Sequence, residues 1–493
     1  MGANNMIYRE IKRRAKQDPD KIIIIGERRN LNYRQLLKEI DACAAYFQSV
    51  GIKAQSSVLI GVPPAPEFYV AFFAACAVGA TAIPLLPSAA GIAAPVRDSK
   101  PAMAIGSRAF INAVRSQLPS ICEELLWDAK NGLHVPNNLK RFKKASLIRD
   151  EKVLALPSSG STGEPMLRHR SAEIVVKRAQ LRAELTAITS TDVLLTTRPI
   201  NSGAGFSFHV TLPVLAGCKV VVHEKFQRFK AAETIAKERV TVLNSVPLVF
   251  ELLASIPTSY PVDFSSLRLC MSGGAPLSRY VREKFYQRYG IHLRQRYGGR
   301  HFSPACAWNY SDIADAVGQK SGPFPLTVLS DEGRENGPDQ IGEVAFDYSK
   351  MAPLWKKALK DNPNRRGKFL HTGDLGRIDS AGNVFIVGRK SRFVKVASNR
   401  VEPAEVEAVL RSHPMIRDAV VFALNAGTPD EAIAAIVATA AKLTVSDVVS
   451  YCAARLQPYK CPRRIEFRRS LPHNAHGKVI RHVFDIANEQ SPA

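Results

Sequence analysis

The chain has 493 residues, which is too long for one ordinary hydrophobic core and favours two or three domains. Its hydrophobic content of 46% suits a folded protein. The chain contains 68 Lys and Arg residues and 44 Asp and Glu residues, which gives a net charge of +24. A charge of this size makes anionic partners a class to consider. The basic residues are spread along the chain rather than gathered in one tail, which favours a solvated basic surface over a nucleic-acid site.

The cysteines and the N-terminal residues indicate in which cellular compartment the protein is expected. Eight cysteines lie far apart without paired metal-ligand spacing, which favours a reducing cytoplasm. The N-terminus lacks the order of a signal peptide, and Met6 stands where a myristoylation signal needs Ser or Thr, so neither export nor a lipid anchor is expected. Residues 68–86 are uncharged for long enough to span a bilayer, but Gly79 and Pro84 favour a buried helix, a turn and a short strand, with no membrane span.

Short β-branched runs alternate with helical patterns from Lys21 onward, which predicts an α/β domain with largely parallel sheets. A helix is expected from about Tyr33. Several runs are apolar throughout, as strands covered on both faces should be. The expected strands lie at 22–25, 56–62, 153–157, 193–197, 219–222, 240–246 and 267–272.

The pattern changes after Gly388. A helix with a strong start signal lies at 401–410, followed by an apolar run at 433–440, a helix near Val445 and a basic strand at 465–469. The expected organisation is therefore a large α/β domain over residues 1–388, in which helices flank the sheets, and a small, mobile α+β domain over residues 389–493.

The strongest local signal is SSGSTGEPM at 158–166, directly after an expected strand. Its glycines allow close backbone approach, and its hydroxyls and amides suit phosphate oxygens. The Walker pattern is absent, and a flexible Ser/Gly-rich loop is the competing interpretation. The phosphate-binding candidates are Ser158, Ser159, Gly160, Ser161, Thr162 and Gly163.

Three further segments carry polar groups at glycine-rich turns. MSGGAPLS at 271–278 follows an expected strand, where open α/β sheets place ligands. In HTGDLGRID with GNVFIVGRK, at 371–390, Asp374 suits ribose hydroxyls, and Arg389 offers a fork of donors to a sugar or phosphate. NAHGKVIR presents Lys478 on a glycine-flanked turn. Taken singly, MSGGAPLS is explained by a glycine turn before a helix, Asp374 and Arg389 by an exposed turn with a surface arginine, and Lys478 by a solvated charge.

Together and in this order, these motifs resemble the adenylate-forming superfamily of acyl- and aryl-CoA synthetases, peptide adenylation domains and luciferases. The resemblance covers nearly the whole chain and includes VGATAIPLLP at 78–87, QRYGG at 295–299, GEVAF at 342–346 and RVEPAEVEAVLRSHP at 400–414. It implies that ATP activates a carboxylic acid as an acyl-adenylate and that the acyl group then passes to a thiol.

The resemblance also implies roles by position. The serine and glycine loop would grip pyrophosphate, and Lys478 would bridge the carboxylate and the α-phosphate, where two anions meet and positive charge is needed. The implied nucleotide-binding residues are Gly274, Ala275, Pro276, Tyr297, Gly298, Asp374 and Arg389. The small domain would rotate at Ser391, in the hinge position. The implied acid pocket is formed by Ser202, Gly203, Phe206, Val246 and Gly273, an open and partly aromatic cleft that suits an aryl or medium acyl group.

Several positions depart from the family pattern. The usual Thr-Glu after Tyr297–Gly298 is replaced by Gly299 and Arg300, so the carboxylate expected to hold Mg²⁺ is not found and its ligands are unknown. Met166 replaces the usual lysine of the phosphate loop. Arg300 and His301 are therefore candidate catalytic cations that take over part of the charge balance.

The sequence leaves open which thiol accepts the acyl group and whether the chain is catalytically active. Coenzyme A is the family default, whereas the basic charge would also steer an acidic acyl carrier protein bearing phosphopantetheine. A catalytically degenerate nucleotide-binding relative is the alternative from another class, because the magnesium carboxylate is missing. A nucleic-acid-binding protein is not favoured, because no recognised module is present. The remaining partner is a small-molecule carboxylic acid.

Overall fold

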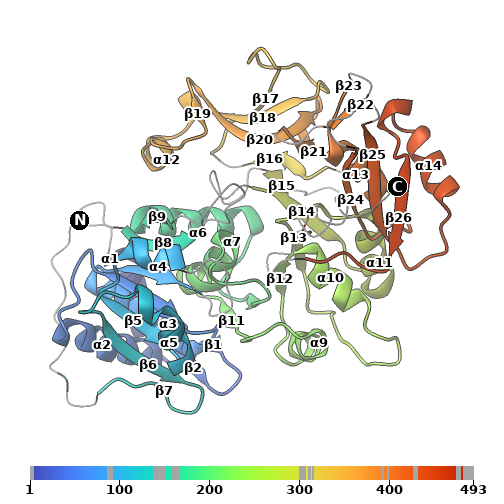
Figure 1. Ribbon diagram of the computed structural model, residues 1–493. Coiled ribbons are helices and arrows are strands. Elements are labelled where there is room, and N and C mark those ends of the chain that lie inside the picture. Colours follow the sequence, from blue (N-terminus) through green and yellow to red (C-terminus); the bar gives the residue numbers. More distant parts are fainter. Residues whose placement is uncertain are drawn as a thin grey trace. The chain divides into compact units, whose positions relative to one another are not determined.

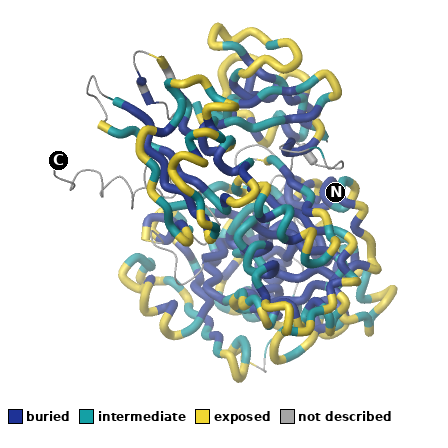
Figure 2. Tube along the Cα trace, turned by 90° about the vertical axis from the view of Figure 1, so that its right-hand side faces the viewer, coloured by how far each residue is buried: buried dark blue, intermediate teal, exposed yellow. Residues whose placement is uncertain are grey.

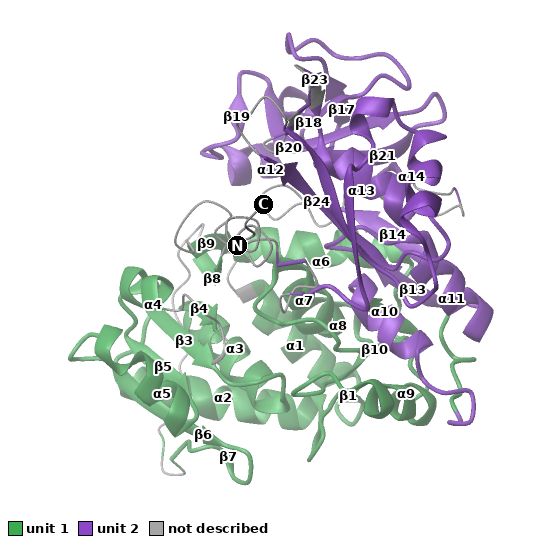
Figure 3. Cartoon of the chain, turned by 45° about the vertical axis from the view of Figure 1, so that its right-hand side comes forward, with its two compact units in different colours: residues 1–244, 262–268 green, residues 245–261, 269–493 purple. Residues whose placement is uncertain are grey.

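The computed structural model divides the chain into two compact units (Figure 3). Unit 1 contains Met1–Asn244 and Val262–Arg268, and unit 2 contains Ser245–Pro261 and Leu269–Ala493. The structure describes residues 5–85, 93–136, 139, 142, 152–157, 167–298, 307–308, 313, 316–321, 323–390, 394–396, 399–425, 431–473 and 479–480. In both units, buried residues follow the strands and the inner helices, while exposed residues follow the turns (Figure 2).

Unit 1 is built from alternating helices and strands (Figure 1). Its helices are α1 (Asn5–Gln17), α2 (Tyr33–Ser49), α3 (Pro66–Val78), α4 (Ala93–Ser99), α5 (Arg108–Val114), α6 (Ala172–Thr186), α7 (Gly203–Phe206), α8 (Leu212–Ala216) and α9 (Arg228–Lys237), with a 3₁₀ turn η1 (Arg115–Gln117) and a π-helical turn η2 (Ser207–Thr211). Its strands are β1 (Ile22–Ile25), β2 (Asn30–Asn32), β3 (Ser57–Gly61), β4 (Thr81–Pro84), β5 (Met103–Gly106), β6 (Glu123–Asp128), β7 (Gly132–Leu133), β8 (Lys152–Pro157), β9 (Leu167–Ser171), β10 (Val193–Leu195), β11 (Lys219–Val221) and β12 (Val242–Ser245), whose last residue belongs to unit 2.

The strands of unit 1 confirm the predicted parallel pairing. One sheet has the order β7-β6-β5-β3-β4-β8-β9, with parallel pairs at its centre and antiparallel pairs at its two edges. A second set runs β12-β10-β11-β1-β2, and only its β1–β2 pair is antiparallel. Parallel strands need crossover connections, and helices of this alternating chain supply them.

Helix α3 explains the long apolar run of the sequence. All of its residues are buried, as expected for a helix that is apolar on every side. Gly79 ends the helix in the left-handed region with φ of +80°, and β4 follows, so the predicted helix, turn and strand are confirmed. Within the described residues, no helix is long and apolar enough to cross a membrane.

Unit 2 is richer in antiparallel strands. Its helices are α10 (Pro247–Ala254), α11 (Arg279–Tyr289), α12 (Pro353–Leu359), α13 (Pro403–Arg411) and α14 (Val445–Ala453), with the 3₁₀ turns η3 (Tyr348–Lys350) and η4 (Pro458–Lys460). Its strands are β13 (Leu269–Ser272), β14 (Leu293–Tyr297), β15 (Ala307–Trp308), β16 (Gly318–Lys320), β17 (Leu326–Leu329), β18 (Gly342–Asp347), β19 (Arg365–Arg366), β20 (Phe369–Ile378), β21 (Asn383–Arg389), β22 (Val394–Val396), β23 (Asn399–Val401), β24 (Asp418–Leu424), β25 (Ala432–Ala438) and β26 (Arg464–Arg468).

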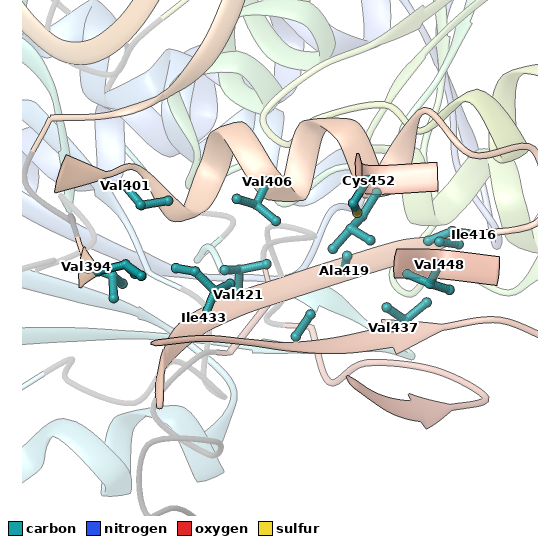
Figure 4. Packing of buried hydrophobic residues seen from close by; sticks show 13 residues of the cluster. Val394, Val401, Val406, Ile416, Ala419, Val421, Ile433, Val437, Val448 and Cys452 are labelled. Carbon is teal, nitrogen blue, oxygen red and sulfur yellow. The ribbon is translucent and has the colours of Figure 1, made fainter. Parts of the chain in front are cut away.

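The C-terminal part of unit 2 has its own hydrophobic core. The three-stranded sheet β24-β25-β26 packs against α13 and α14, and buried side chains from these elements meet in one cluster (Figure 4). Ile433 of the central strand is 1% exposed, and Val406 of α13 is fully buried. This arrangement confirms the α+β pattern expected after Gly388.

Truncation of this core should destabilise the fold. We expect Ile433→Ala to lower the free energy of unfolding by about 2–5 kcal/mol, because the substitution removes buried methyl groups and leaves a cavity. Chemical denaturation followed by circular dichroism measures this loss. Val445→Ala is the matched control, since Val445 is 46% exposed and its truncation should cost less than about 0.5 kcal/mol. Equal effects of the two substitutions would contradict the assigned packing.

A histidine near the C-terminal end should make the stability of this part depend on pH. His473 Nε2 lies 3.1 Å from Asp418 Oδ2, and this hydrogen bond raises the pKa of His473 although burial opposes it. A raised pKa contributes stability that is present below the unfolded pKa of about 6.5 and is lost as pH rises through the folded pKa. We therefore expect His473→Gln to be more destabilising near about pH 5.5 than near about pH 8.5 in thermal denaturation. A pH-independent effect would refute this role of the charged imidazole.

Candidate functional site

The Asp374 carboxylate is the centre of the candidate site in unit 2. Tyr297 Oη donates a hydrogen bond of 2.6 Å to Asp374 Oδ2, and Arg389 Nη1 donates one of 2.7 Å to Oδ1. Asp374 and Arg389 face each other across β20 and β21, while Tyr297 comes from the end of β14. Three residues predicted from two separate sequence segments therefore lie together. Each carboxylate oxygen keeps a second lone pair, so Asp374 can still accept from a ligand diol.

A local distortion of β20 sets the position of this carboxylate. Gly373 has φ of +72°, a conformation that favours glycine, and its carbonyl oxygen accepts a hydrogen bond of 2.8 Å from the Lys390 backbone amide. Thr372 Oγ1 donates to the Val344 carbonyl oxygen at 2.5 Å and accepts from the Asp374 amide at 3.0 Å. The Thr-Gly-Asp sequence thus builds the turn that presents Asp374.

A buried acid, Glu343 of β18, holds this turn from behind. Glu343 is 7% exposed, and its Oε1 accepts from the Gly373 amide at 3.2 Å. Its Oε2 lies 3.1 Å from His371 Nδ1 and 3.2 Å from Lys390 Nζ. Burial alone would raise the pKa of Glu343, but its hydrogen bonds to His371 and Lys390 outweigh burial and lower that pKa. Glu343 belongs to the GEVAF segment of the sequence, yet only the structure reveals this role.

The predicted nucleotide-binding residues Gly274, Ala275 and Pro276 lie on a turn after β13. The Gly273 amide donates to the Ser245 carbonyl oxygen at 3.1 Å, and a Cβ at Gly273 would lie only 2.7 Å from Arg296 Cγ. Gly274 has φ of +95°, so this turn also favours glycine. Gly274 and Pro276 are exposed and Ala275 is half-buried, as is Tyr297, while Gly298 is exposed. An exposed turn at the end of a buried strand is a surface on which a ring can lie.

The predicted acid-pocket residues belong to both units. In unit 1, Ser202 Oγ accepts from the Gly205 amide at 3.0 Å and so caps α7, which begins at Gly203. Phe206 is 2% exposed and its ring lies 4.8 Å from that of Phe72, so this aromatic ring belongs to the core. In unit 2, Val246 is 6% exposed and follows Ser245, the partner of Gly273.

Several predicted residues lie outside the described residues. They are Ser158, Ser159, Gly160, Ser161, Thr162, Gly163, Arg300, His301, Ser391 and Lys478. The strands that flank the first of these segments are paired, with Pro157 of β8 opposite Leu167 of β9. Within the part of the chain that the structure describes, no group of three or more His, Cys, Asp or Glu side chains is arranged to hold a metal ion.

Comparison with known proteins gives a consistent result. The sequence profile of AMP-binding enzymes matches residues 11–353, and that of the AMP-binding enzyme C-terminal domain matches residues 405–478. An indoleacetate–CoA ligase of Aromatoleum aromaticum is 27% identical and covers 95% of both chains. A medium-chain fatty-acid–CoA ligase of Escherichia coli is 27% identical and covers 94% of this chain and 87% of its own.

The fold is also that of solved acid–CoA ligases. The crystal structure of an anthranilate CoA ligase in complex with anthranoyl-AMP matches with a TM-score of 0.85 at 21% identity, covering 99% of this chain and 97% of its own. The predicted fold class is confirmed: a large N-terminal part of sheets and helices precedes a small C-terminal domain.

Removal of the central carboxylate charge tests the site. We expect Asp374→Asn to weaken ATP binding roughly tenfold to a hundredfold, because a hydrogen bond to a charged group contributes about 1.5–3 kcal/mol. Tyr297→Phe, which removes one donor to this carboxylate, should have a smaller effect. Isothermal titration calorimetry measures both affinities, with Asp361→Asn as the matched control at an exposed carboxylate of the same unit. Wild-type ATP affinity in Asp374→Asn would exclude this carboxylate from the nucleotide site.

Proposed function

We propose that this chain activates an aryl or fatty acid with ATP and transfers the acyl group to coenzyme A, because the chain belongs to the AMP-binding enzyme family of AMP-forming acid–CoA ligases. The acid's carboxylate oxygen attacks the α-phosphorus of ATP, and pyrophosphate leaves. The thiolate of coenzyme A then attacks the acyl carbon, and AMP leaves. The convergence of Tyr297, Asp374 and Arg389 is the observation that carries this proposal.

The cationic residues of the proposed site supply the positive charge that the reaction requires. The first step brings the anionic carboxylate against an anionic phosphate, so positive charge must be held where the new bond forms. We assign this role to Lys478, aided by Arg300 and His301. Arg389, whose side chain is 56% exposed, keeps donors beyond the one that it gives to Asp374 and is available to the sugar or phosphate.

The second step requires a different arrangement of the small domain. We propose that residues 389–493 form this domain and that it rotates about Ser391, so that the thiol replaces Lys478 at the reacting centre. The interval between the two matched family ranges, which end at residue 353 and resume at residue 405, supports a boundary in this part of the chain. The separate core around Ile433 supports a domain that moves as one body.

Two alternatives follow from particular residues. The net charge of +24 would draw an acidic carrier protein, and transfer to its phosphopantetheine arm is the alternative to coenzyme A. The replacement of the magnesium carboxylate by Gly299 and Arg300 favours a degenerate nucleotide-binding relative as the second alternative. In the main proposal, Mg²⁺ accompanies ATP, with ligands that are not assigned. The cytoplasmic location expected from the cysteines stays a prediction.

Exchange of pyrophosphate into ATP separates these possibilities. With a panel of aryl and fatty acids, acid-dependent exchange supports an adenylating enzyme, whereas tight ATP binding without exchange for every acid supports the degenerate relative. Product analysis with coenzyme A and with a loaded carrier protein then identifies the acceptor. The acceptor that gives the higher kcat/KM is the physiological class of thiol.

The catalytic lysine has its own test. We expect Lys478→Ala to reduce acid-dependent exchange by roughly a hundredfold or more, because a charge at the transition state is lost, while the fold and ATP affinity stay close to wild type. Lys442→Ala is the matched control at an exposed lysine of the same domain and should exchange normally. Undiminished exchange in Lys478→Ala would refute the assigned role.

A further inference from the structure

Within unit 2, an arginine of the proposed small domain contacts two residues that precede the proposed hinge. The Nε atom of Arg417, the residue directly before β24, lies 3.4 Å from Glu251 Oε1 of α10. The guanidinium carbon of Arg417 lies 5.5 Å from the centre of the Tyr280 ring of α11, within the range of a cation–π contact. In Figure 1, α10 and α11 lie below the sheet that contains β24. We call these three residues the Arg417 contact.

Each side of the Arg417 contact is oriented by its own part of unit 2. Arg417 Nη1 donates a hydrogen bond of 3.4 Å to the carbonyl oxygen of Arg469, which follows β26 in the proposed small domain. Tyr280 Oη accepts a hydrogen bond of 3.1 Å from Lys284 Nζ on the same helix. The guanidinium and the ring are therefore oriented before they meet, so less side-chain entropy is lost when the contact forms.

The ion pair between Arg417 and Glu251 is partly buried. The side chain of Arg417 is 25% exposed and that of Glu251 is 21% exposed, so water and salt screen this pair less than a fully exposed one. Burial raises the pKa of Glu251, although the charges of Arg417 and Lys284 lower it. Withdrawal of Arg417 would leave the Glu251 carboxylate with less compensation, so the pair favours the arrangement in which the two residues meet.

The Arg417 contact depends on how the proposed small domain is placed, because each side has its own packing. Phe250 of α10 and Phe285 of α11 pack edge to face with their ring centres 5.4 Å apart, which holds these two helices together. The separate core shown in Figure 4 holds β24 in the small domain. Rotation about Ser391 carries Arg417 along with β24 and leaves Glu251 behind with α10. The contact is then made in one arrangement and broken in another.

We propose that Glu251 and Arg417, aided by Tyr280, are positioning residues that set the balance between the two arrangements of the small domain, and hence between the two steps of the reaction. This inference rests on the proposed function and deepens it. A contact that exists in only one of two arrangements shifts their populations by its own free energy. This effect does not require any of the three residues to touch the acid, ATP or the thiol.

Removal of either charge should change the balance in the same direction. Arg417→Met removes the cation and keeps a long side chain, while Glu251→Gln removes the anion and keeps its shape. Because both substitutions break the same pair, each should shift the ratio of the two step rates by roughly threefold to thirtyfold. The double variant should shift the ratio no further than the larger single shift. An effect of net charge on the anionic ATP or coenzyme A would instead have opposite signs in the two single variants.

The test measures the two steps separately in the full-length protein, with the most active acid of the aryl and fatty acid panel. Acid-dependent exchange of pyrophosphate into ATP gives the rate of the first step, and single-turnover transfer from the preformed acyl-adenylate to coenzyme A gives that of the second. Arg455→Met is the matched control, because the guanidinium carbon of Arg455 lies 3.8 Å from the centre of the Tyr451 ring within the small domain. This cation–π contact is kept in either arrangement. Thermal denaturation checks that each variant is folded.

A ratio that shifts in the same direction in Arg417→Met and Glu251→Gln, and stays at the wild-type value in Arg455→Met, supports the proposal. The step that slows relative to the other is then the one served by the arrangement in which Arg417 meets Glu251. If no acid supports exchange, the proposed function fails, but energy transfer between dyes attached at the exposed positions 361 and 442 still reports on the arrangement. A change of transfer in the same direction in both variants then supports the contact.

Other results overturn the proposal. An unchanged ratio in both variants, or an equal loss of both steps, shows a structural role at most and leaves the proposed function standing. Shifts of opposite sign identify an effect of charge on the anionic ligands and refute the role of the pair. An equal shift in Arg455→Met refutes it as well. Where no acid supports exchange, unchanged energy transfer in both variants has the same meaning.

Discussion

The carboxylate of Asp374 accepts hydrogen bonds from residues at the ends of two other strands, and its position depends on a second, buried carboxylate behind it. Glu343 joins the Gly373 amide, His371 and Lys390, so the distorted stretch of β20 is held by charge-assisted hydrogen bonds rather than by apolar packing. Removal of one partner of a buried ion pair typically costs about 3–5 kcal/mol, because the other charge stays behind. The turn that presents Asp374 is therefore as well determined as the sheet itself, which suits a site that must hold a ligand in one orientation.

The charge of a buried arginine near the C-terminal sheet is balanced by two carboxylates. Arg411 is enclosed by Glu407 and Asp418, and this network ties α13 to β24 in the small domain.

Sequence patterns were sufficient to predict most of the helices and strands and part of the candidate site. The apolar run at residues 68–86 is long enough to span a bilayer, yet its interruption by Gly79 and Pro84 predicted the buried helix, turn and strand that the structure contains. Asp374 and Arg389 were predicted from local motifs, yet their contact with Tyr297 depends on how β14, β20 and β21 are ordered in space.

The departures from the family pattern at Met166 and Gly299 have opposite effects on the charge of the proposed site. Loss of the usual lysine at Met166 removes a positive charge, and loss of the usual glutamate at Gly299 removes a negative one. The two changes cancel in net charge, so the overall attraction of the site for the triphosphate need not fall, whereas the ion that the glutamate would hold loses its fixed partner. Arg300 adds a positive charge next to the lost glutamate in the sequence, and His301 adds another when it is protonated, which favours direct contact between protein cations and phosphate over a protein-held metal. In the proposed mechanism, charge balance at the phosphates rests on Lys478 and on these two residues, and adenylation by this chain should be less dependent on a carboxylate-held Mg²⁺ than adenylation by family members that keep the glutamate.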